Sequence, residues 1–176
     1  MKRYSTIAVV TFITFSMLNC GGTRVISDHD PSVDFKAYKT FVVCADDLVV
    51  KNVAHGDFDN PQNRQKIYEA SALAMTQKGF TKVEENPELQ VGFKMLVEEE
   101  DFQVSNCHNG EPINYWEECT IENITFTEHT VIVYLTDLKQ DQIVWQASHS
   151  QVEVSPGRMS RALPTIVEDL FAELPY

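Results

Sequence analysis

The sequence has no apolar run long enough to cross a bilayer. The longest mostly apolar stretch, residues 7–18, has 12 residues, whereas a transmembrane helix needs about 20. This stretch follows Lys2 and Arg3, and a basic start before a short apolar run is typical of a secretory signal. We therefore expect residues 1–19 to be a signal peptide, with a buried N-terminal helix or strand as the alternative.

Basic residues are scarce, with 14 lysines and arginines against 26 acidic residues and a formal net charge of −12. Nucleic-acid binding depends on cations that neutralise phosphates, so this composition argues against a nucleic-acid partner. An anionic membrane surface would also repel the chain, and membrane attachment would then have to come from a lipid. A charge of this size is otherwise typical of a solvated surface.

Cysteines are few, with four in the chain, and no two have C-x-x-C spacing. The spacing therefore gives no support for a zinc or thioredoxin-like site. Cys107 and Cys119 bracket a polar, loop-like segment, and in an exported protein we expect them to form a disulfide. Such a bridge would close a loop of about 13 residues, worth roughly 3 kcal/mol in the chain-entropy model. Cys44 ends an apolar run and is expected to be a buried thiol.

Cys20 follows the apolar stretch, with Asn19 between them. It resembles the cysteine of the bacterial lipobox, which receives a diacylglycerol before the chain is cut in front of it. Asn19 replaces the usual Gly, Ala or Ser, so plain signal cleavage is the alternative. The resemblance predicts lipidation of Cys20. Because Gly21 and Gly22 are not acidic, it also predicts sorting to the outer membrane with the domain facing the periplasm.

Motifs of the common enzyme classes are also missing. The chain has no G-x-S-x-G segment, no H-E-x-x-H spacing and no glycine-rich phosphate loop. The acidic run at residues 98–101 alternates sides on a strand, which is typical of a solvated strand end. His129 and His149 lie on strands joined by a hairpin, either as diagonal neighbours or on opposite faces. We predict no catalytic residue, no metal site and no cofactor.

The sequence does contain a clear alternation of strand and helix patterns. Strands are expected over residues 37–43, 89–104, 120–126, 129–138 and 142–154. One helix should start at Asn60-Pro61 and end at Lys78-Gly79. A second should start near Leu163, with Pro164 in its first turn, and stop at Pro175.

This order of elements predicts an α+β fold. We expect a two-layer sandwich in which a mostly antiparallel sheet of about four to five strands has two helices packed on one face. The polar, turn-rich residues 20–34 should form a lipid-anchored tether, and residues 35–176 a single domain. Tyr115 and Trp116 lie between the two bracketing cysteines. They are either part of a binding surface or packed within their own loop.

Three segments carry short motifs in a fixed order. The first has Asp-x-Asp, Asp-Phe and Tyr-x-Thr-Phe, and comprises Asp28, Asp30, Asp34, Phe35, Tyr38, Thr40 and Phe41. The second joins a helix end to a strand start, and comprises Lys78, Gly79, Phe80, Pro87, Glu88 and Leu89. The third has an acid before a hairpin and Val-Trp after it, and comprises Asp137, Val144 and Trp145.

Together these motifs resemble a bacterial lipoprotein family, domain of unknown function 4136, over roughly residues 28–175. His129 departs from the pattern, since the family usually has glycine there, and the cysteine-bracketed segment looks peculiar to this branch. The resemblance implies a small periplasmic α+β domain on a lipid anchor, and it implies no activity and no catalytic residues.

We therefore expect a lipid-anchored envelope protein that binds or scaffolds an envelope protein partner without catalysis. One alternative is a carrier with an apolar cavity between sheet and helices for a small ligand. The other is a metal-dependent envelope hydrolase, which would require His129, His149 and the carboxylates of residues 98–101 to converge in a cleft.

Overall fold

The computed structural model describes residues 24–51, 53–106, 120–152 and 156–176. All five of the predicted site residues lie outside these ranges, as do the predicted signal peptide and the first residues of the predicted tether. The lipidation of Cys20, the Cys107–Cys119 disulfide and the binding surface at Tyr115 and Trp116 therefore stay predictions. None of the described helices is long and apolar enough to span a membrane.

The described residues form one sheet of six strands in the order β1-β6-β5-β4-β2-β3. These strands are β1 (Arg24–His29), β2 (Thr40–Val43), β3 (Thr81–Lys82), β4 (Leu89–Asn106), β5 (Thr120–Asp137) and β6 (Gln142–Val152). The pairs β1–β6, β6–β5 and β5–β4 are antiparallel, whereas β2 runs parallel to both β4 and β3. The mostly antiparallel sheet is confirmed, with one strand more than the upper bound expected.

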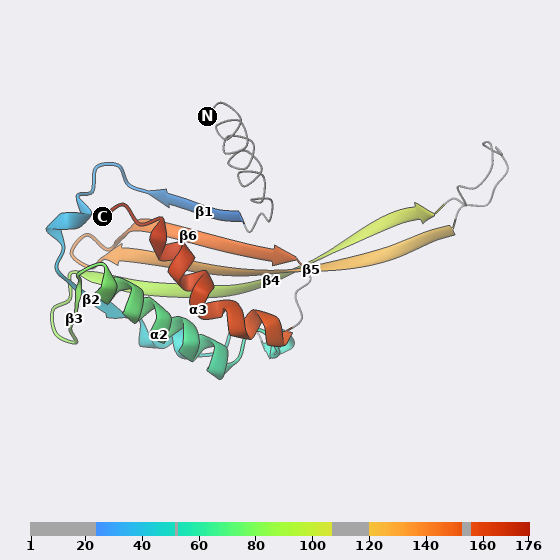
Figure 1. Ribbon diagram of the computed structural model, residues 1–176, viewed down its shortest axis with the longest axis horizontal. Coiled ribbons are helices and arrows are strands. Elements are labelled where there is room, and N and C mark those ends of the chain that lie inside the picture. The colour runs from blue at the N-terminus through green and yellow to red at the C-terminus, as the bar shows by residue number, and fades with distance from the viewer. Residues whose placement is uncertain (1–23, 52, 107–119, 153–155) are drawn as a thin grey trace, which may run out of the picture.

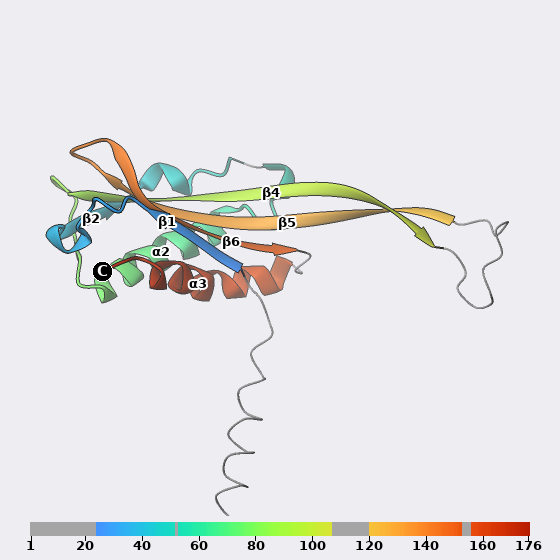
Figure 2. The same ribbon diagram turned by 90° about the horizontal axis from the view of Figure 1, so that it is seen from above.

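Two helices, α2 (Pro61–Gln77) and α3 (Pro156–Ala172), lie on the same side of the sheet (Figures 1 and 2). The connections contain three 3-10 turns, η1 (Phe35–Ala37), η2 (Ala45–Leu48) and η3 (Val53–His55). The core lies between the two layers, and the side chains there that are at most 1% exposed include Phe41, Val91, Val133, Leu135, Trp145, Ile67, Met75, Leu163, Leu170 and Phe171. The two-layer α+β fold is therefore confirmed.

Strand β1 corrects the expected start of the domain. Its six residues pair with β6, from Arg24 opposite Ser150 to His29 opposite Trp145, and the N–H of Asp30 then donates to the carbonyl of Val144. Residues 24–34 are thus part of the domain and not of a tether. The strand has little apolar patterning because it lies at the sheet edge, where Ile26 is 53% exposed.

Helix α2 begins and ends as the sequence predicts. Asn60 caps the helix by accepting the N–H of Asn63 at 2.9 Å, and Pro61 is its first residue. After the helix, Gly79 has a φ of +94°, a left-handed conformation that favours glycine at this position.

Helix α3 begins at Pro156, seven residues before the expected start, and has Pro164 in its interior. Proline has no N–H, so the carbonyl four residues earlier, that of Ser160, loses its helical donor. The ammonium of Lys66 on α2 replaces that donor, at 3.1 Å from the Ser160 carbonyl and 2.6 Å from the Ser160 hydroxyl. A contact from the neighbouring helix therefore satisfies the carbonyl that the proline leaves free.

Strands β4 and β5 extend far beyond the body of the domain (Figures 1 and 2). β2 pairs with β4 only as far as Val91, and β6 pairs with β5 only from Glu128 onward. Residues 99–106 of β4 and 120–127 of β5 pair with each other alone. We call this two-stranded ribbon the arm.

Candidate functional site

The first and third sequence motifs meet at the end of the sheet opposite the arm. The hydroxyl of Tyr38 donates to Asp137 Oδ2 at 2.7 Å, and Asp137 Oδ1 accepts the N–H groups of Lys139 and Gln140. Burial and the Asp137 carboxylate raise the pKa of Tyr38 to about 12. Burial would raise the pKa of Asp137, but its hydrogen bonds outweigh burial and the pKa lies below its usual value.

The second motif joins the same end of the sheet through Glu88. Its carboxylate accepts the backbone N–H of Lys39 at 2.6 Å and that of Thr40 at 3.0 Å, and these bonds lower the pKa of Glu88. The N–H of Glu88 donates to the Thr40 hydroxyl in return. The three motifs thus tie the start of β2, the start of β4 and the end of β5 together, which is a structural role.

The two strand histidines are diagonal neighbours on the helix-facing side of the sheet. His149 pairs with Val131, and His129 pairs with Gln151 two residues away. Both histidines are buried, and burial lowers the pKa of each. Within the described residues, neither Nδ1 atom has a hydrogen-bond partner.

The acidic residues 98–101 do not join the histidines. They are exposed on successive positions of β4, so they alternate between the two faces of the sheet. The charged groups that act on His129 are Asp57 and His55 instead. Across the described ranges, no group of three or more His, Cys, Asp or Glu side chains is placed to hold a metal ion. The convergence that the hydrolase hypothesis requires is thus missing from this part of the chain.

The described hollows lie at the surface, whereas a carrier would need a cavity between the two layers. One groove of about 310 Å³ is lined by α2 and α3, including Ala70, Leu73 and Pro164. Leu73 is 59% exposed there. In the described residues the space between sheet and helices is filled by the core side chains, so the structure gives the carrier hypothesis no cavity of that kind.

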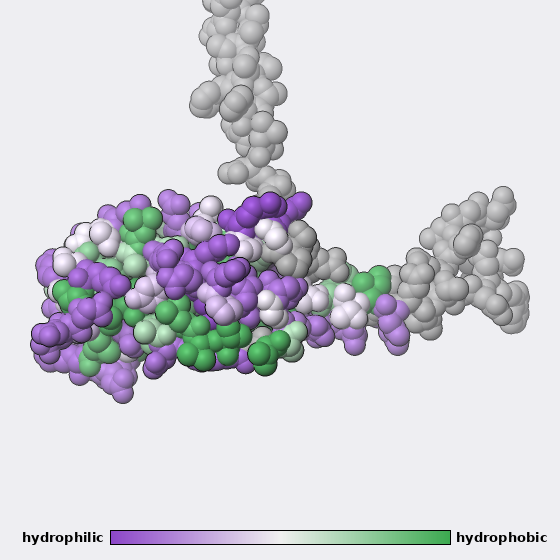
Figure 3. Space-filling model, turned by 90° about the horizontal axis from the view of Figure 1, so that it is seen from below, coloured by the Kyte–Doolittle hydropathy of each residue, from purple (hydrophilic) through white to green (hydrophobic). Residues whose placement is uncertain are grey.

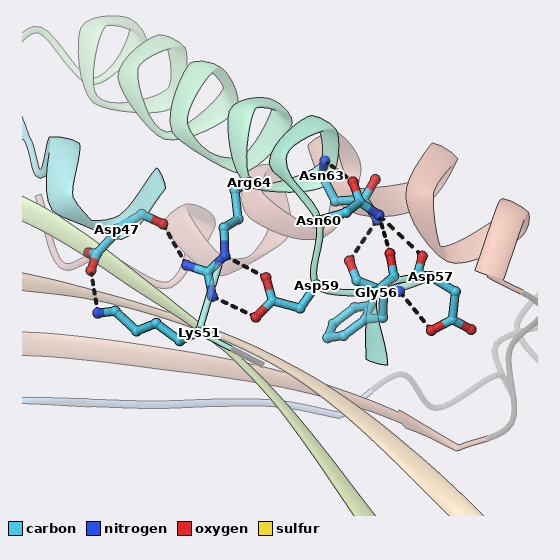
Figure 4. A network of polar contacts seen from close by, with 9 residues as sticks. Asp47, Lys51, Gly56, Asp57, Asp59, Asn60, Asn63 and Arg64 are labelled. Atoms are coloured by element: carbon cyan, nitrogen blue, oxygen red, sulfur yellow. Dashed lines mark hydrogen bonds and ion pairs between the residues drawn. The ribbon is translucent and has the colours of Figure 1, made fainter. Parts of the chain in front are cut away.

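A buried polar network lies where the chain leaves β2 and passes the edge of β4 (Figure 4). The guanidinium of Arg64 on α2 binds both carboxylate oxygens of Asp59 and donates to the backbone carbonyl of Asp47. The Asp47 carboxylate accepts the N–H of Phe93 at 2.9 Å and lies 3.6 Å from Lys51 Nζ. No motif in the sequence indicates this network. Arginine is rarely buried, whereas Arg64 is only 2% exposed.

Beyond this network no described strand pairs with the outer edge of β4. A hollow of about 280 Å³ lies beside it, lined by Lys51, Arg64, Phe93, Lys94, Met95, Leu96, Val97 and Glu98. Exposed apolar side chains are found on the same edge and on the connection next to it: Leu96 is 40%, Val49 63% and Val53 85% exposed. Figure 3 looks onto this side of the molecule and shows hydrophobic residues gathered close to the base of the arm.

Comparison with known proteins decides the family. The family model "Domain of unknown function (DUF4136)" matches residues 25–176. The chain belongs to the DUF4136 family. The resemblance of its three motifs to this family is thereby confirmed. The match also begins within β1, in agreement with a domain that includes that strand. No curated protein matches the sequence.

Solved structures share the DUF4136 fold at low sequence identity. A DUF4136 family protein from Bacteroides thetaiotaomicron VPI-5482 is 16% identical, with a TM-score of 0.55 over 89% of this chain and 97% of the other. A PDZ domain protein from Parabacteroides distasonis ATCC 8503 is 13% identical, with a TM-score of 0.55 over 88% of this chain. The chain spans 36% of the length of that PDZ domain protein. These likenesses show the fold alone.

Proposed function

We propose that this DUF4136 protein is a lipid-anchored envelope lipoprotein that binds or scaffolds another envelope protein, without catalysis, through its arm. The lipid on Cys20 would hold it at the outer membrane with the domain facing the periplasm. The observation that carries this proposal is the arm itself, which leaves the body as a ribbon of only two strands. An isolated two-stranded ribbon is marginally stable in water, so a partner that packs against the arm would stabilise it.

The distribution of side chains along the arm supports a binding role. In the body, Val131 and Val133 of β5 face the helices and are fully buried. Side chains alternate without a register shift along the β4–β5 pair, so Ile124 and Phe126 project from the opposite face. Thr125 and Thr127 take the helix-facing positions. The apolar side of the ribbon therefore changes faces where the body ends, and no described helix covers it there.

A variant without the arm tests this role. Residues 99–127 are replaced by Asn-Gly, which suits a two-residue hairpin between the paired residues Glu98 and Glu128. The body should keep its melting temperature within a few degrees, because none of the described core residues lies in the replaced segment. In intact cells, crosslinking and pull-down of the full-length chain should recover a specific envelope protein, and the armless variant should lose it.

The control for this experiment changes a surface of the body and leaves the arm intact. Leu73→Gln alters the groove between the helices at a residue that is 59% exposed. This variant should still recover the partner. If the armless variant recovers the same partner as the full-length chain, the arm is not the binding element and the proposal fails.

A further inference from the structure

We propose that the free edge of β4 binds an extended, basic segment of the partner polypeptide by adding it to the sheet as a further strand. This inference rests on the proposed binding function. It assigns the binding to a surface that starts in the body at Met95 and continues onto the arm at Glu99, and it names a partner chemistry. Strand addition is a common mode of peptide recognition, in which main-chain hydrogen bonds supply affinity and pockets for alternate side chains supply specificity.

The hydrogen-bonding groups of this edge follow from the pairing of β4. Its neighbour β2 reaches only Val91, whose carbonyl accepts the N–H of Cys44. The N–H of Phe93 is the next group directed to this side, and the Asp47 carboxylate takes it. Alternate residues share a direction, so the N–H and carbonyl groups of Met95, Val97 and Glu99 point outward. In the described part of the chain, no strand pairs with them.

The hollow beside this edge would receive a side chain of the added strand. Its walls include Phe93 and Met95, which are buried core residues, and Val97, which packs against the core. The stem of Lys51 borders the same hollow. Side chains of a strand alternate, so a strand that pairs with β4 would place an apolar residue here and its next residue on the opposite face.

Charge identifies the kind of segment that fits. Glu98, Glu99, Glu100 and Asp101 follow one another along the edge and are all exposed. Glu98 also lies opposite Glu128, and like charges in that position are destabilising. A segment with lysine or arginine at alternate positions would relieve this repulsion. A second copy of the chain would bring a second acidic run and a further net charge of −12, which disfavours it as the occupant.

The test uses a labelled heptapeptide that alternates lysine and valine, with a heptapeptide that alternates glutamate and valine as its control. Binding to the full-length, detergent-solubilised protein is followed by amide NMR and fluorescence anisotropy. The basic peptide should shift the amide signals of Met95, Val97 and Glu99 and protect them from hydrogen exchange. The acidic peptide should do neither. If the basic peptide leaves these signals unchanged up to millimolar concentration, the inference is wrong.

Two matched proline variants separate strand addition from plain charge attraction. Glu99→Pro removes an outward N–H from the β4 edge and should weaken binding of the basic peptide at least tenfold more than Glu99→Gln, which removes the charge alone. Thr127 is the cross-strand partner of Glu99, and its backbone points to the other edge of the ribbon. Thr127→Pro should therefore leave binding within about twofold. A basic peptide in which every backbone amide is N-methylated has no donor on either edge and should also fail to bind. If it binds as well as the unmodified peptide, the attraction is only electrostatic and strand addition is excluded.

The same variants distinguish this inference from the proposed function. If Glu99→Pro still recovers the envelope partner in cells while the armless variant does not, the arm binds its partner elsewhere, and only the strand addition is refuted. Sedimentation of the full-length protein tests the competing occupant. A dimer that is lost in Glu99→Pro would show that a second copy takes the edge, and would overturn the choice of a basic segment.

Discussion

At the scale of single residues, Gly92 shows how a position inside a strand depends on its neighbour across the sheet. Gly92 pairs with Tyr134, and the Tyr134 ring occupies the space that a methyl group at position 92 would need. Lys94 Nζ lies 5.7 Å from the centre of the same ring. The glycine therefore lets the ring lie flat along the sheet, a need that the sequence of β4 alone does not reveal.

Gly92→Ala should therefore destabilise the fold by about 1–3 kcal/mol, because the new methyl group overlaps the tyrosine ring. Urea unfolding of the wild type and the variant measures this difference. The control is the same change in a Tyr134→Ala background, where the space is empty. There Gly92→Ala should be neutral or slightly stabilising, because without a clash alanine lowers the conformational entropy of the unfolded chain relative to glycine. An equal cost in both backgrounds would rule out the ring as the cause.

The buried histidines make stability depend on pH. Burial lowers the pKa of His129 and His149 below the ordinary value of 6.5. Below about pH 6.5 the unfolded chain thus binds more protons than the folded one, and the free energy of unfolding falls as the pH falls. Below the pKa values that the two histidines have in the folded protein, they cause no further decrease in the free energy of unfolding. Asp57 acts on His129, and Asp169 on His149, in the direction that opposes this shift.

The measurement is urea unfolding at several pH values between about 5 and 7. His149→Leu removes one of the two titrating groups and should reduce the slope of stability against pH in this range. The buried ring of His149, 1% exposed, has no partner for Nδ1 in the described residues, so the leucine should cost little at pH 7. An unchanged slope would assign the pH dependence to other groups.

At the scale of elements, α3 depends on a contact from α2. The Pro164 ring leaves the Ser160 carbonyl without a helical donor, and Lys66 supplies one. The Ser160 hydroxyl continues the contact to Asn63 Oδ1 at 2.6 Å. The sequence pattern places both helices, but it predicts a shorter α3, because proline in a helix interior is normally destabilising. Only the packing of the two helices makes the longer helix favourable.

Lys66→Met keeps most of the side-chain stem and removes the ammonium, so the Ser160 carbonyl loses its donor. The expected cost is about 1–2 kcal/mol in the free energy of unfolding, measured in urea. Pro164→Ala restores the missing N–H and provides the control. In the Pro164→Ala background, Lys66→Met should lower the free energy of unfolding by clearly less than it does in the wild type. If the two changes are simply additive, Lys66 does not stabilise the helix through this carbonyl.

At the scale of the whole molecule, the position of β1 relates the arm to the expected lipid. Arg24 pairs with Ser150, Ser150 with Thr130, and Thr130 with Leu96. Arg24 is therefore level with the base of the arm. Four chain steps separate Cys20 from Arg24, which spans at most about 14 Å. A lipid on Cys20 would thus hold this end of the sheet, and the base of the arm, close to the membrane surface.

The anchor is tested by growing cells with radiolabelled palmitate. The wild-type protein should take up the label, because the lipobox resemblance predicts acylation at Cys20. Cys20→Ala should abolish the label and leave the precursor uncleaved. Cys44→Ala serves as the matched control, since Cys44 is a free, half-buried thiol within the domain, and its label should be unchanged. A labelled Cys20→Ala protein would refute the lipid anchor.

The sequence by itself determined the layers of this protein. The apolar periodicities of β4, β5, β6 and α2 are local, and they set both the element types and the faces that the core buries. The same periodicity left two registers open for His129 and His149, and the register shift between Leu135 and Thr136 decides that they are diagonal neighbours. The family motifs were also readable, because each is a short run of adjacent residues.

The tertiary structure decided what depends on contacts between distant segments. β1 is a strand because the edge of β6 offers hydrogen bonds, and α3 continues through Pro164 because Lys66 reaches it. Arg64 is buried because Asp59 and the Asp47 carbonyl satisfy it. The edge of β4 is free because β2 ends early, and the arm has only two strands because β6 stops before it. None of these follows from local pattern, since each is settled by which groups meet after the chain has folded.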